Sequence, residues 1–261
     1  MKVLYLTNLF PYPTRISGGI FIHRRLLQYK TDSSCDFQVF CLPYYEFSPA
    51  LRLAMKYLGK TCYETCNQWN LDGINYTYCT LRRNLFTVFL QKTFPEQNMR
   101  LEKQICHNIL KQFDLHKLDL VHAHGMYEVA AGNVARLISE RTGIPYVITL
   151  HGSDVNIVMR KRTANYVDTL ENASKCIFVS KALLKKAKSF GYSGRNGIVI
   201  PNGYDTKIFY PMDKDTVRNN LGVYRPNLKY VGFVGNLNKV KRADKLPSIF
   251  WEIQKRVQDV T

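Results

Sequence analysis

The chain has 261 residues, of which 46% are hydrophobic, enough to bury one sizeable core. Its 37 lysine and arginine residues against 20 aspartate and glutamate residues give a formal charge of +17, which favours anionic partners such as acidic lipids, nucleotide phosphates or nucleic acids. No stretch approaches the roughly 18 apolar residues of a membrane span, and the apolar run after Lys2 is too short for a signal peptide, so we expect a cytoplasmic protein. Patterns typical of zinc-finger, homeodomain, RRM and KH modules are absent, which argues against nucleic acid as the partner.

Short apolar strands alternate with helices along most of the chain. Residues 44–72 are the exception, with an irregular pattern and one amphipathic helix near 49–58. Elsewhere the periodicity predicts strands over 3–6, 37–41, 120–123, 146–150, 176–179 and 197–200, and helices up to 29 and over 99–116, 127–142, 155–172 and 181–190. This alternation is typical of a Rossmann-like α/β fold, a doubly wound parallel sheet with helices on both faces.

A domain boundary is expected near residue 205. There a β-branched strand is followed by Pro201-Asn202-Gly203, a turn that we expect to need a positive φ. We assign residues 1–205 to the amino-terminal domain, 206–226 to a linker, and 227–261 to the start of a second Rossmann-like domain that opens with a strand over 228–234. Because an independent domain needs roughly 100 residues, we expect this second domain to be incomplete and its strand to have open edges.

Glycines follow the first strand, at the edge of the sheet where doubly wound folds bind ligands. Gly18 and Gly19 stand just before a helix, where backbone N–H groups and the helix dipole favour an anion. Their spacing does not match the dinucleotide fingerprint. The alternative interpretation is a plain flexible loop.

Histidines follow two other strands. His151 can present its imidazole or its carbonyl to a polar ligand, with Asp154 beside it; the alternative is a histidine held by local capping, with Asp154 as the helix N-cap. His122 and His124 surround Ala123, and we expect their rings on opposite faces of the sheet, one packed and one facing the cleft. That arrangement disfavours a two-histidine metal site.

The remaining candidates for metal binding have simpler explanations. The seven cysteines lack a Cys-x-x-Cys pair and are expected to be reduced thiols; Cys62 and Cys66 have metal-compatible spacing but no third ligand nearby. Asp213 and Asp215 form an Asp-x-Asp motif at a helix start, where capping and the helix dipole account for both carboxylates. Ser180 likewise is expected to cap the helix that follows it.

Two segments mix basic with aliphatic and aromatic residues. Residues 51–58 and 82–90 both have this composition, which suits a peripheral contact with an anionic membrane, here at its inner face. The alternative is a basic helix face that only contacts water, an interpretation that we prefer for Lys181, Lys185 and Lys188.

Taken together, these motifs resemble glycosyltransferase family 4, retaining enzymes of the GT-B architecture with two facing Rossmann-like lobes. The resemblance covers residues 1 to 261 in order. It rests on Gly18-Gly19, Asp119-Leu-Val-His-Ala-His-Gly125, Thr149-Leu-His-Gly-Ser-Asp154, Val179-Ser-Lys181 and Ile200-Pro-Asn-Gly-Tyr-Asp205 with the following Phe209-Tyr-Pro211. It implies that a hexose or related sugar is transferred from a nucleoside-diphosphate sugar to an acceptor hydroxyl, with retention and without a metal or other cofactor. The implied acceptor is a glycan or lipid-linked molecule in surface polysaccharide or glycoconjugate synthesis.

The resemblance also implies roles for individual residues. His151 would be the catalytic-site histidine that contacts the donor sugar, and Asp154 would shape its pocket. Gly18 and Gly19 would lie near the donor phosphates and the acceptor, and the Asn202-Gly203 turn would fix the crossover between the lobes. In the second lobe, Gly235 and Lys241 match residues that reach the donor diphosphate.

The chain departs from the family pattern in two places. Asn236 stands where the family has an arginine that binds the diphosphate, which leaves Lys241 as the main cation. The family's pair of acidic residues, which contact the donor sugar and ribose, does not occur before Thr261, so we expect these 261 residues to be weakly active or inactive and to bind nucleoside diphosphates weakly. Two alternatives stay open: a nucleotide-sugar epimerase of the same architecture, and a non-catalytic remnant that binds an acceptor or a membrane.

Overall fold

The computed structural model describes residues 1–31, 35–59, 66–94, 96–112, 117–235, 237 and 241–261. This part of the chain divides into two compact units, Met1–Asn202 and Gly203–Thr261.

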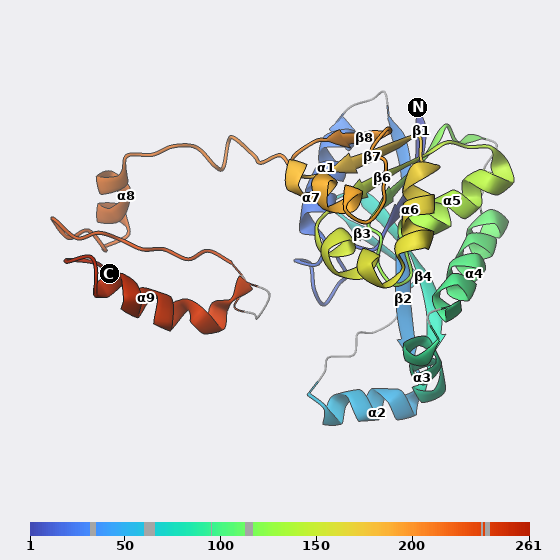
Figure 1. Ribbon diagram of the computed structural model, residues 1–261, viewed down its shortest axis with the longest axis horizontal. Helices are drawn as coiled ribbons and strands as arrows, with labels where there is room; N and C mark the ends of the chain where they lie inside the picture. Colours follow the sequence, from blue (N-terminus) through green and yellow to red (C-terminus); the bar gives the residue numbers. More distant parts are fainter. Residues whose placement is uncertain (32–34, 60–65, 95, 113–116, 236, 238–240) are drawn as a thin grey trace. The chain divides into compact units, whose positions relative to one another are not determined.

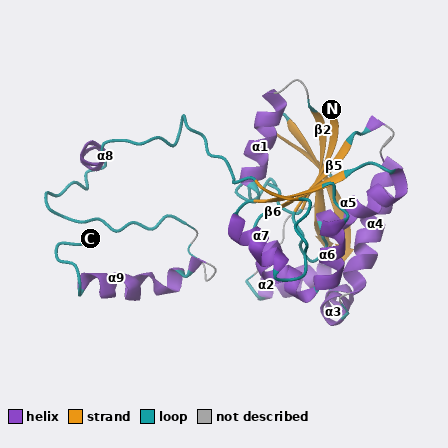
Figure 2. Cartoon of the chain, turned by 45° about the horizontal axis from the view of Figure 1, so that its top comes forward, coloured by secondary structure: helices purple, strands orange, loops and turns teal. Residues whose placement is uncertain are grey.

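An eight-stranded sheet forms the centre of the first unit, with the strand order β3-β4-β2-β1-β5-β6-β7-β8 (Figures 1 and 2). All neighbouring strands pair in parallel except β3 and β4, which are antiparallel. The strands are β1 (Lys2–Thr7), β2 (Asp36–Phe47), β3 (Gln68–Leu71), β4 (Ile74–Arg83), β5 (Leu120–His124), β6 (Tyr146–Leu150), β7 (Lys175–Phe178) and β8 (Gly197–Val199). The predicted doubly wound α/β fold is therefore confirmed.

Both faces of the sheet are buried, as strand β1 shows most clearly. Its residues Val3 and Tyr5 pack in a cluster with residues of helix α1, whereas Leu4 and Leu6 belong to a second cluster with residues of α4 and α5. Successive strand residues point to opposite faces, so a strand that is apolar at every position needs helices on both sides. The helices of this unit are α1 (Ile20–Thr31), α2 (Pro49–Tyr57), α3 (Leu85–Thr93), α4 (Glu96–Gln112), α5 (Ala131–Thr142), α6 (Thr163–Glu171) and α7 (Lys181–Lys188).

The edge of the sheet beyond β2 differs from the prediction. Residues 44–47 continue β2, and a β3–β4 hairpin occupies a region for which no strand was predicted. The hairpin turns at Asp72 and Gly73, whose φ angles of 50° and 75° are those of the tight turn that an Asp-Gly pair favours. The sequence therefore contained the signal for this hairpin.

The segment after β6 is also less regular than the predicted helix over 155–172. It begins with a π-helical turn (Asp154–Val158), continues with a 3-10 turn (Met159–Lys161), and becomes α-helical only in α6. Such π-helical turns are often found at functional sites. The helix predicted over 181–190 forms as α7, and Ser180 caps it by accepting a hydrogen bond from the Leu183 N–H at 3.2 Å.

The second unit contains α8 (Lys214–Asn220), a 3-10 turn (Ala243–Lys245) and α9 (Leu246–Gln254). Neither α8 nor α9 has a buried residue. The strand predicted over 228–234 is wrong, since this stretch forms only an isolated bridge between Lys229 and Val260. A single strand is not stable without neighbours to pair with and a layer to pack on.

Two smaller predictions near the boundary have different outcomes. The helix start at residues 213–215 is confirmed, because the Asp213 carboxylate accepts a hydrogen bond from the Thr216 N–H at 2.8 Å. The predicted turn at Pro201-Asn202-Gly203 is wrong: neither Asn202 nor Gly203 has a positive φ. Residues 200–205 contain no turn or bend, so no left-handed residue is required.

Candidate functional site

The strand order of the sheet reverses between the neighbouring strands β1 and β5. The chain continues from β1 to β2 on one side of this pair, and from β5 to β6 on the other side. Doubly wound folds bind ligands at this switch point, at the carboxyl ends of the strands. The backbone joins the strand ends here: the Asn8 N–H donates to the His124 carbonyl at 3.1 Å, and the Gly125 N–H donates to the Thr149 carbonyl at 3.0 Å.

Asn8 fixes the loops at the switch point. Its side-chain amide donates to the carbonyls of Leu42 at 2.6 Å and Val129 at 2.8 Å, and its oxygen accepts from the Ala131 N–H at 2.9 Å. One side chain thus joins the end of β1 to the middle of β2 and to the segment between β5 and α5. Asn8 was not predicted as a site residue, although an asparagine directly after a buried strand is a polar group that needs such partners.

Three histidines gather at this edge, and we call His122, His124 and His151 the histidine cluster. The ring centroids of His122 and His124 are 4.3 Å apart, those of His124 and His151 are 5.5 Å apart, and the ring of Tyr5 lies 5.0 Å from His122. The prediction that His122 and His124 face opposite sides of the sheet is wrong. Residues two apart in a strand point to the same face, which is why their rings stack.

Hydrogen bonds connect the histidine cluster only in part. Nε2 of His122 lies 2.8 Å from Oγ1 of Thr149, and Nδ1 of His124 lies 3.2 Å from Nε2 of His151. Two buried ring atoms, Nε2 of His124 and Nδ1 of His151, have no hydrogen-bond partner. Buried polar atoms without partners are uncommon in proteins and mark places where a ligand or water can bind.

All three rings are held neutral. Burial lowers the pKa of His122 to about 3 and that of His151 to about 4, and it lowers the pKa of His124 well below its ordinary value; the charge of Arg25 acts in the same direction on each. A neutral imidazole has one donor and one acceptor nitrogen. The tautomer of His124 therefore decides whether the unpaired Nδ1 of His151 is a donor or an acceptor towards a ligand.

Asp154 shapes the turn that presents His151. Its buried carboxylate accepts hydrogen bonds from the backbone N–H groups of His151 at 2.9 Å, Gly152 at 2.7 Å and Val155 at 3.0 Å. Burial raises the pKa of Asp154, and these three hydrogen bonds oppose that rise. The expected role of Asp154 as the helix N-cap is wrong, because Ser153 occupies that position and Asp154 is the first residue of the π-helical turn. Its carboxylate instead orients the backbone of His151 through these hydrogen bonds.

Gly18 and Gly19 lie where the loop after β1 meets the start of α1. A Cβ atom on Gly19, whose φ is 65°, would lie 2.5 Å from the carbonyl carbon of Leu9, and one on Gly18 would lie 3.0 Å from the carbonyl oxygen of Phe10. Close packing of the loop on itself therefore requires a glycine at position 19 and leaves little room for a side chain at position 18. Phe21, in the first turn of α1, contacts the candidate site, with its ring 5.0 Å from that of His151.

The other predicted site residues are distributed over both units. Asn202 ends the first unit, and its side-chain oxygen accepts a hydrogen bond from Nη2 of Arg25 at 3.0 Å. Arg25 was not predicted as a site residue, yet it is the cation whose charge acts on all three histidines. Gly203, Gly235 and the exposed Lys241 belong to the second unit, and Asn236 lies outside the described residues.

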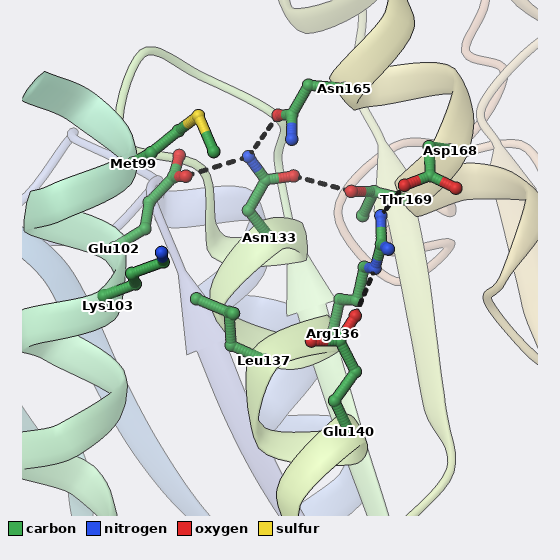
Figure 3. A pocket seen from close by; sticks show the side chains of 10 residues that line it. All are labelled: Met99, Glu102, Lys103, Asn133, Arg136, Leu137, Glu140, Asn165, Asp168 and Thr169. Atoms are coloured by element: carbon green, nitrogen blue, oxygen red, sulfur yellow. Dashed lines mark hydrogen bonds and ion pairs between the residues drawn. The ribbon is translucent and has the colours of Figure 1, made fainter. Parts of the chain in front are cut away.

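A cavity of about 240 Å³ lies among α4, α5 and α6, away from every predicted site residue (Figure 3). Its polar lining is part of what we call the Glu102 network, formed by Glu102, Asn133, Arg162, Asn165 and Thr169. The Glu102 carboxylate accepts from Arg162 Nη1 at 3.1 Å, from the Ala130 N–H at 2.9 Å and from the Asn133 amide at 3.0 Å. These groups satisfy one another, which is typical of an interior network that fixes helices in place.

Within the described part of the chain, no group of three or more histidine, cysteine or acidic residues is arranged to hold a metal ion. Cys62 lies outside the described residues, so the predicted absence of a site at Cys62 and Cys66 stays a prediction.

Comparison with known proteins shows similarity to two glycosyltransferases. Over 228 residues, the chain is 28% identical to the putative teichuronic acid biosynthesis glycosyltransferase TuaC of Bacillus subtilis, a match that covers 85% of this chain and 55% of TuaC. A shorter stretch of 95 residues, 36% of this chain and 26% of the relative, is 35% identical to the uncharacterized glycosyltransferase MJ1178 of Methanocaldococcus jannaschii.

Solved structures show the same fold. Anabaena HepE in complex with UDP-glucose superposes with a TM-score of 0.59 at 18% identity, over 100% of this chain and 59% of HepE. The chain therefore spans little more than half the length of TuaC and of HepE. The model of the family described as Glycosyltransferase Family 4 matches residues 58–208, which is more than half of the chain. The protein belongs to glycosyltransferase family 4.

Proposed function

We propose that the protein takes part in the transfer of a sugar from a nucleoside-diphosphate sugar to an acceptor hydroxyl, with retention of the anomeric configuration and without a metal ion. The acceptor belongs to a surface polysaccharide or a related glycoconjugate, in line with the name of TuaC. The first unit supplies the histidine cluster, with His151 placed against the donor sugar. Gly18, Gly19 and the start of α1 line the same edge of the sheet.

The unpaired Nδ1 of His151 is the observation that carries this proposal. A buried, neutral imidazole costs free energy while one nitrogen has no partner, and a sugar hydroxyl is both a donor and an acceptor. Either tautomer of His151 can therefore bind a hydroxyl. A neutral ring also suits a donor sugar that carries no charge of its own.

The leaving group of this reaction is a diphosphate, which gains negative charge as the glycosidic bond breaks. Fixed N–H dipoles at a helix start and a lysine stabilise such charge without reorganising. We assign these tasks to the Gly18-Gly19 turn before α1 and to Lys241 of the second unit. Asn236 adds no charge at the position where related enzymes have an arginine, so Lys241 is the principal cation for the diphosphate in that unit.

A transfer assay with a panel of donors tests the proposed function. The protein is incubated with isotopically labelled UDP-, GDP- and ADP-sugars and with glycan or lipid-linked acceptors, and the anomeric configuration of the product is read by NMR. We expect label in an acceptor, the same anomeric configuration as in the donor, and an unchanged rate after treatment with EDTA. Epimerisation of the free donor in the absence of acceptor would contradict the proposal, and loss of transfer with EDTA would contradict its metal-free mechanism.

A further inference from the structure

The two basic and apolar segments predicted to contact a membrane lie together at one end of the first unit. Strands β2 and β4 pair up to their last residues, Phe47 with Arg83, and the Ser48 N–H donates to the Arg83 carbonyl at 2.8 Å. Ser48 caps α2 and Asn84 caps α3, so the two helices begin at adjacent points (Figure 1). We call their outward side, with Leu58 and Phe94 that follow them, the α2/α3 face.

The α2/α3 face exposes large apolar side chains. On α2, Leu53 is 72% exposed and Tyr57 is 92% exposed, while on α3 the exposed fractions are 65% for Phe86 and 60% for Phe89. Leu51 is the one residue of α2 that is buried, and no side chain of α3 that the structure describes is fully buried. A hollow of about 630 Å³ lies beside Leu53 and Tyr57. Contiguous exposed apolar surface of this kind marks an interaction site.

The charges on this face select the occupant. Residues 48–59 and 84–94 contain no aspartate or glutamate, while Arg52 and Lys56 are exposed on α2 and Arg82 is exposed at the end of β4, where it pairs with Glu46 at 3.4 Å. Aromatic and aliphatic side chains bordered by cations are typical of helices that lie in the interface of an anionic bilayer. No helix among the described residues is long and apolar enough to cross a bilayer.

We propose that the α2/α3 face binds the surface of an anionic lipid bilayer, with Tyr57, Phe86 and Phe89 inserted among the headgroups and Arg52 and Lys56 beside the lipid phosphates. The strands β1, β2 and β4 are parallel, so the carboxyl ends of β2 and β4 point to the same edge of the sheet as the histidine cluster. The bilayer therefore lies at the same edge of the sheet as the histidine cluster. If the proposed transfer holds, a lipid-linked acceptor is the substrate that this placement favours.

Vesicle sedimentation with matched variants tests the proposal without any enzymatic assay. The protein is mixed with phosphatidylcholine vesicles with or without phosphatidylglycerol. We expect sedimentation with the anionic vesicles and release as salt is raised. The double variant Phe86→Ser/Phe89→Ser should bind at least about tenfold more weakly, because each bulky apolar side chain inserted in a bilayer adds roughly that factor. Its control, Ile198→Ser/Ile200→Ser, replaces two exposed apolar residues elsewhere in the first unit and should bind normally.

A second pair of variants separates local from overall charge. Arg52→Glu/Lys56→Glu and Lys181→Glu/Lys185→Glu change the net charge equally, but only the first pair lies on the α2/α3 face. The first should lose binding by about tenfold or more, and the second should keep most of it. Equal losses in the two variants would overturn the proposal, because they would mean attraction by net charge alone.

Two further outcomes would also overturn it. Equal binding to neutral and anionic vesicles would remove the role of the cations. Self-association of the protein without lipid, abolished by Phe86→Ser/Phe89→Ser, would show that a second copy of the chain covers the face. Tyr57→Ser changes the most exposed aromatic of α2 and should weaken vesicle binding without a change in thermal unfolding, so a misfolded double variant does not decide the result.

Discussion

The histidine cluster and the Glu102 network are both polar and buried, but they differ in how completely their atoms are paired. In the Glu102 network, the carboxylate, the amides and the guanidinium all bond to one another or to the backbone. In the histidine cluster, Nδ1 of His151 and Nε2 of His124 have no partner. A complete set of partners indicates a structural role, whereas missing partners at the ligand-binding edge of the sheet indicate a site.

Replacing His151 should lower activity and leave stability nearly unchanged. We expect His151→Ala to lower the turnover of sugar transfer by roughly 10²–10⁴-fold, the range for a group that acts directly on the reacting molecule. Thermal unfolding should change little, because one ring nitrogen has no partner to lose and the other has a single contact, at 3.2 Å from Nδ1 of His124. Both properties are measured on the same preparation, turnover by the release of labelled product and stability by calorimetry.

The exposed His107 provides the matched control, and His107→Ala should leave turnover and stability unchanged. A large loss of stability in His151→Ala together with intact specific activity would assign His151 to the structural class. The histidine cluster would then have a structural role, like the Glu102 network.

Replacing Glu102 should have the opposite effect to replacing His151, with a loss of stability and little change in activity. The side chains of Glu102 and Arg162 are 3% and 8% exposed, so Glu102→Ala leaves a buried guanidinium without its counter-charge. We expect the free energy of unfolding to fall by about 3–5 kcal/mol, while the turnover of the molecules that remain folded is retained. Urea denaturation gives the first quantity, and an assay at low temperature gives the second.

An exposed ion pair is the control for Glu102. Glu46 pairs with Arg82, whose side chain is 93% exposed, and Glu46→Ala should cost only about 0–1 kcal/mol. If Glu102→Ala were as stable as Glu46→Ala and lost its turnover instead, the cavity among α4, α5 and α6 would be the functional site.

The sequence predicted these two clusters unequally, for a physical reason. His151 could be identified because a histidine directly after a buried strand lies at the ligand-binding edge whatever the neighbouring strands are. Asn8 also follows a buried strand, so its place at this edge could have been predicted, but its partners could not, because Leu42 and Val129 are 34 and 121 positions away. The role of Arg25 likewise depends on residues that only the sheet order brings close. The Glu102 network joins three helices and has no local signal either.

The fold shows the same division between local and distant causes. The strands of the parallel core could be predicted because their apolar runs are local. The signal for the hairpin at Asp72-Gly73 was equally local, but it was not recognised, and the two strands β3 and β4 at that edge of the sheet were therefore not predicted. The strand expected over 228–234 failed because strands are stabilised by neighbours, and among the described residues of the second unit that stretch has only the bridge to Val260.

The pH dependence of stability offers the smallest and most specific test. Burial holds the pKa of His151 at about 4, against 6.5 for an ordinary histidine. Between these values, the unfolded chain binds a proton that the folded chain does not. The stability is therefore complete above about pH 6.5 and is lost as the pH falls towards 4. His122 and His124, whose pKa values burial also lowers, add to the same loss.

In the variant His151→Ala, the unfolded chain no longer binds a proton at position 151 as the pH falls. Its free energy of unfolding, measured by urea titration at intervals from pH 7 to about pH 5, should fall less steeply than that of the wild type, by up to about 1.4 kcal/mol per pH unit. Burial raises the pKa of Asp154, which acts with the opposite sign, but Asp154 is present in both proteins and so does not enter the difference. Identical slopes for the wild type and His151→Ala would mean that His151 is open to water and accepts a proton freely, and the neutral ring required for the proposed contact with a sugar would not exist.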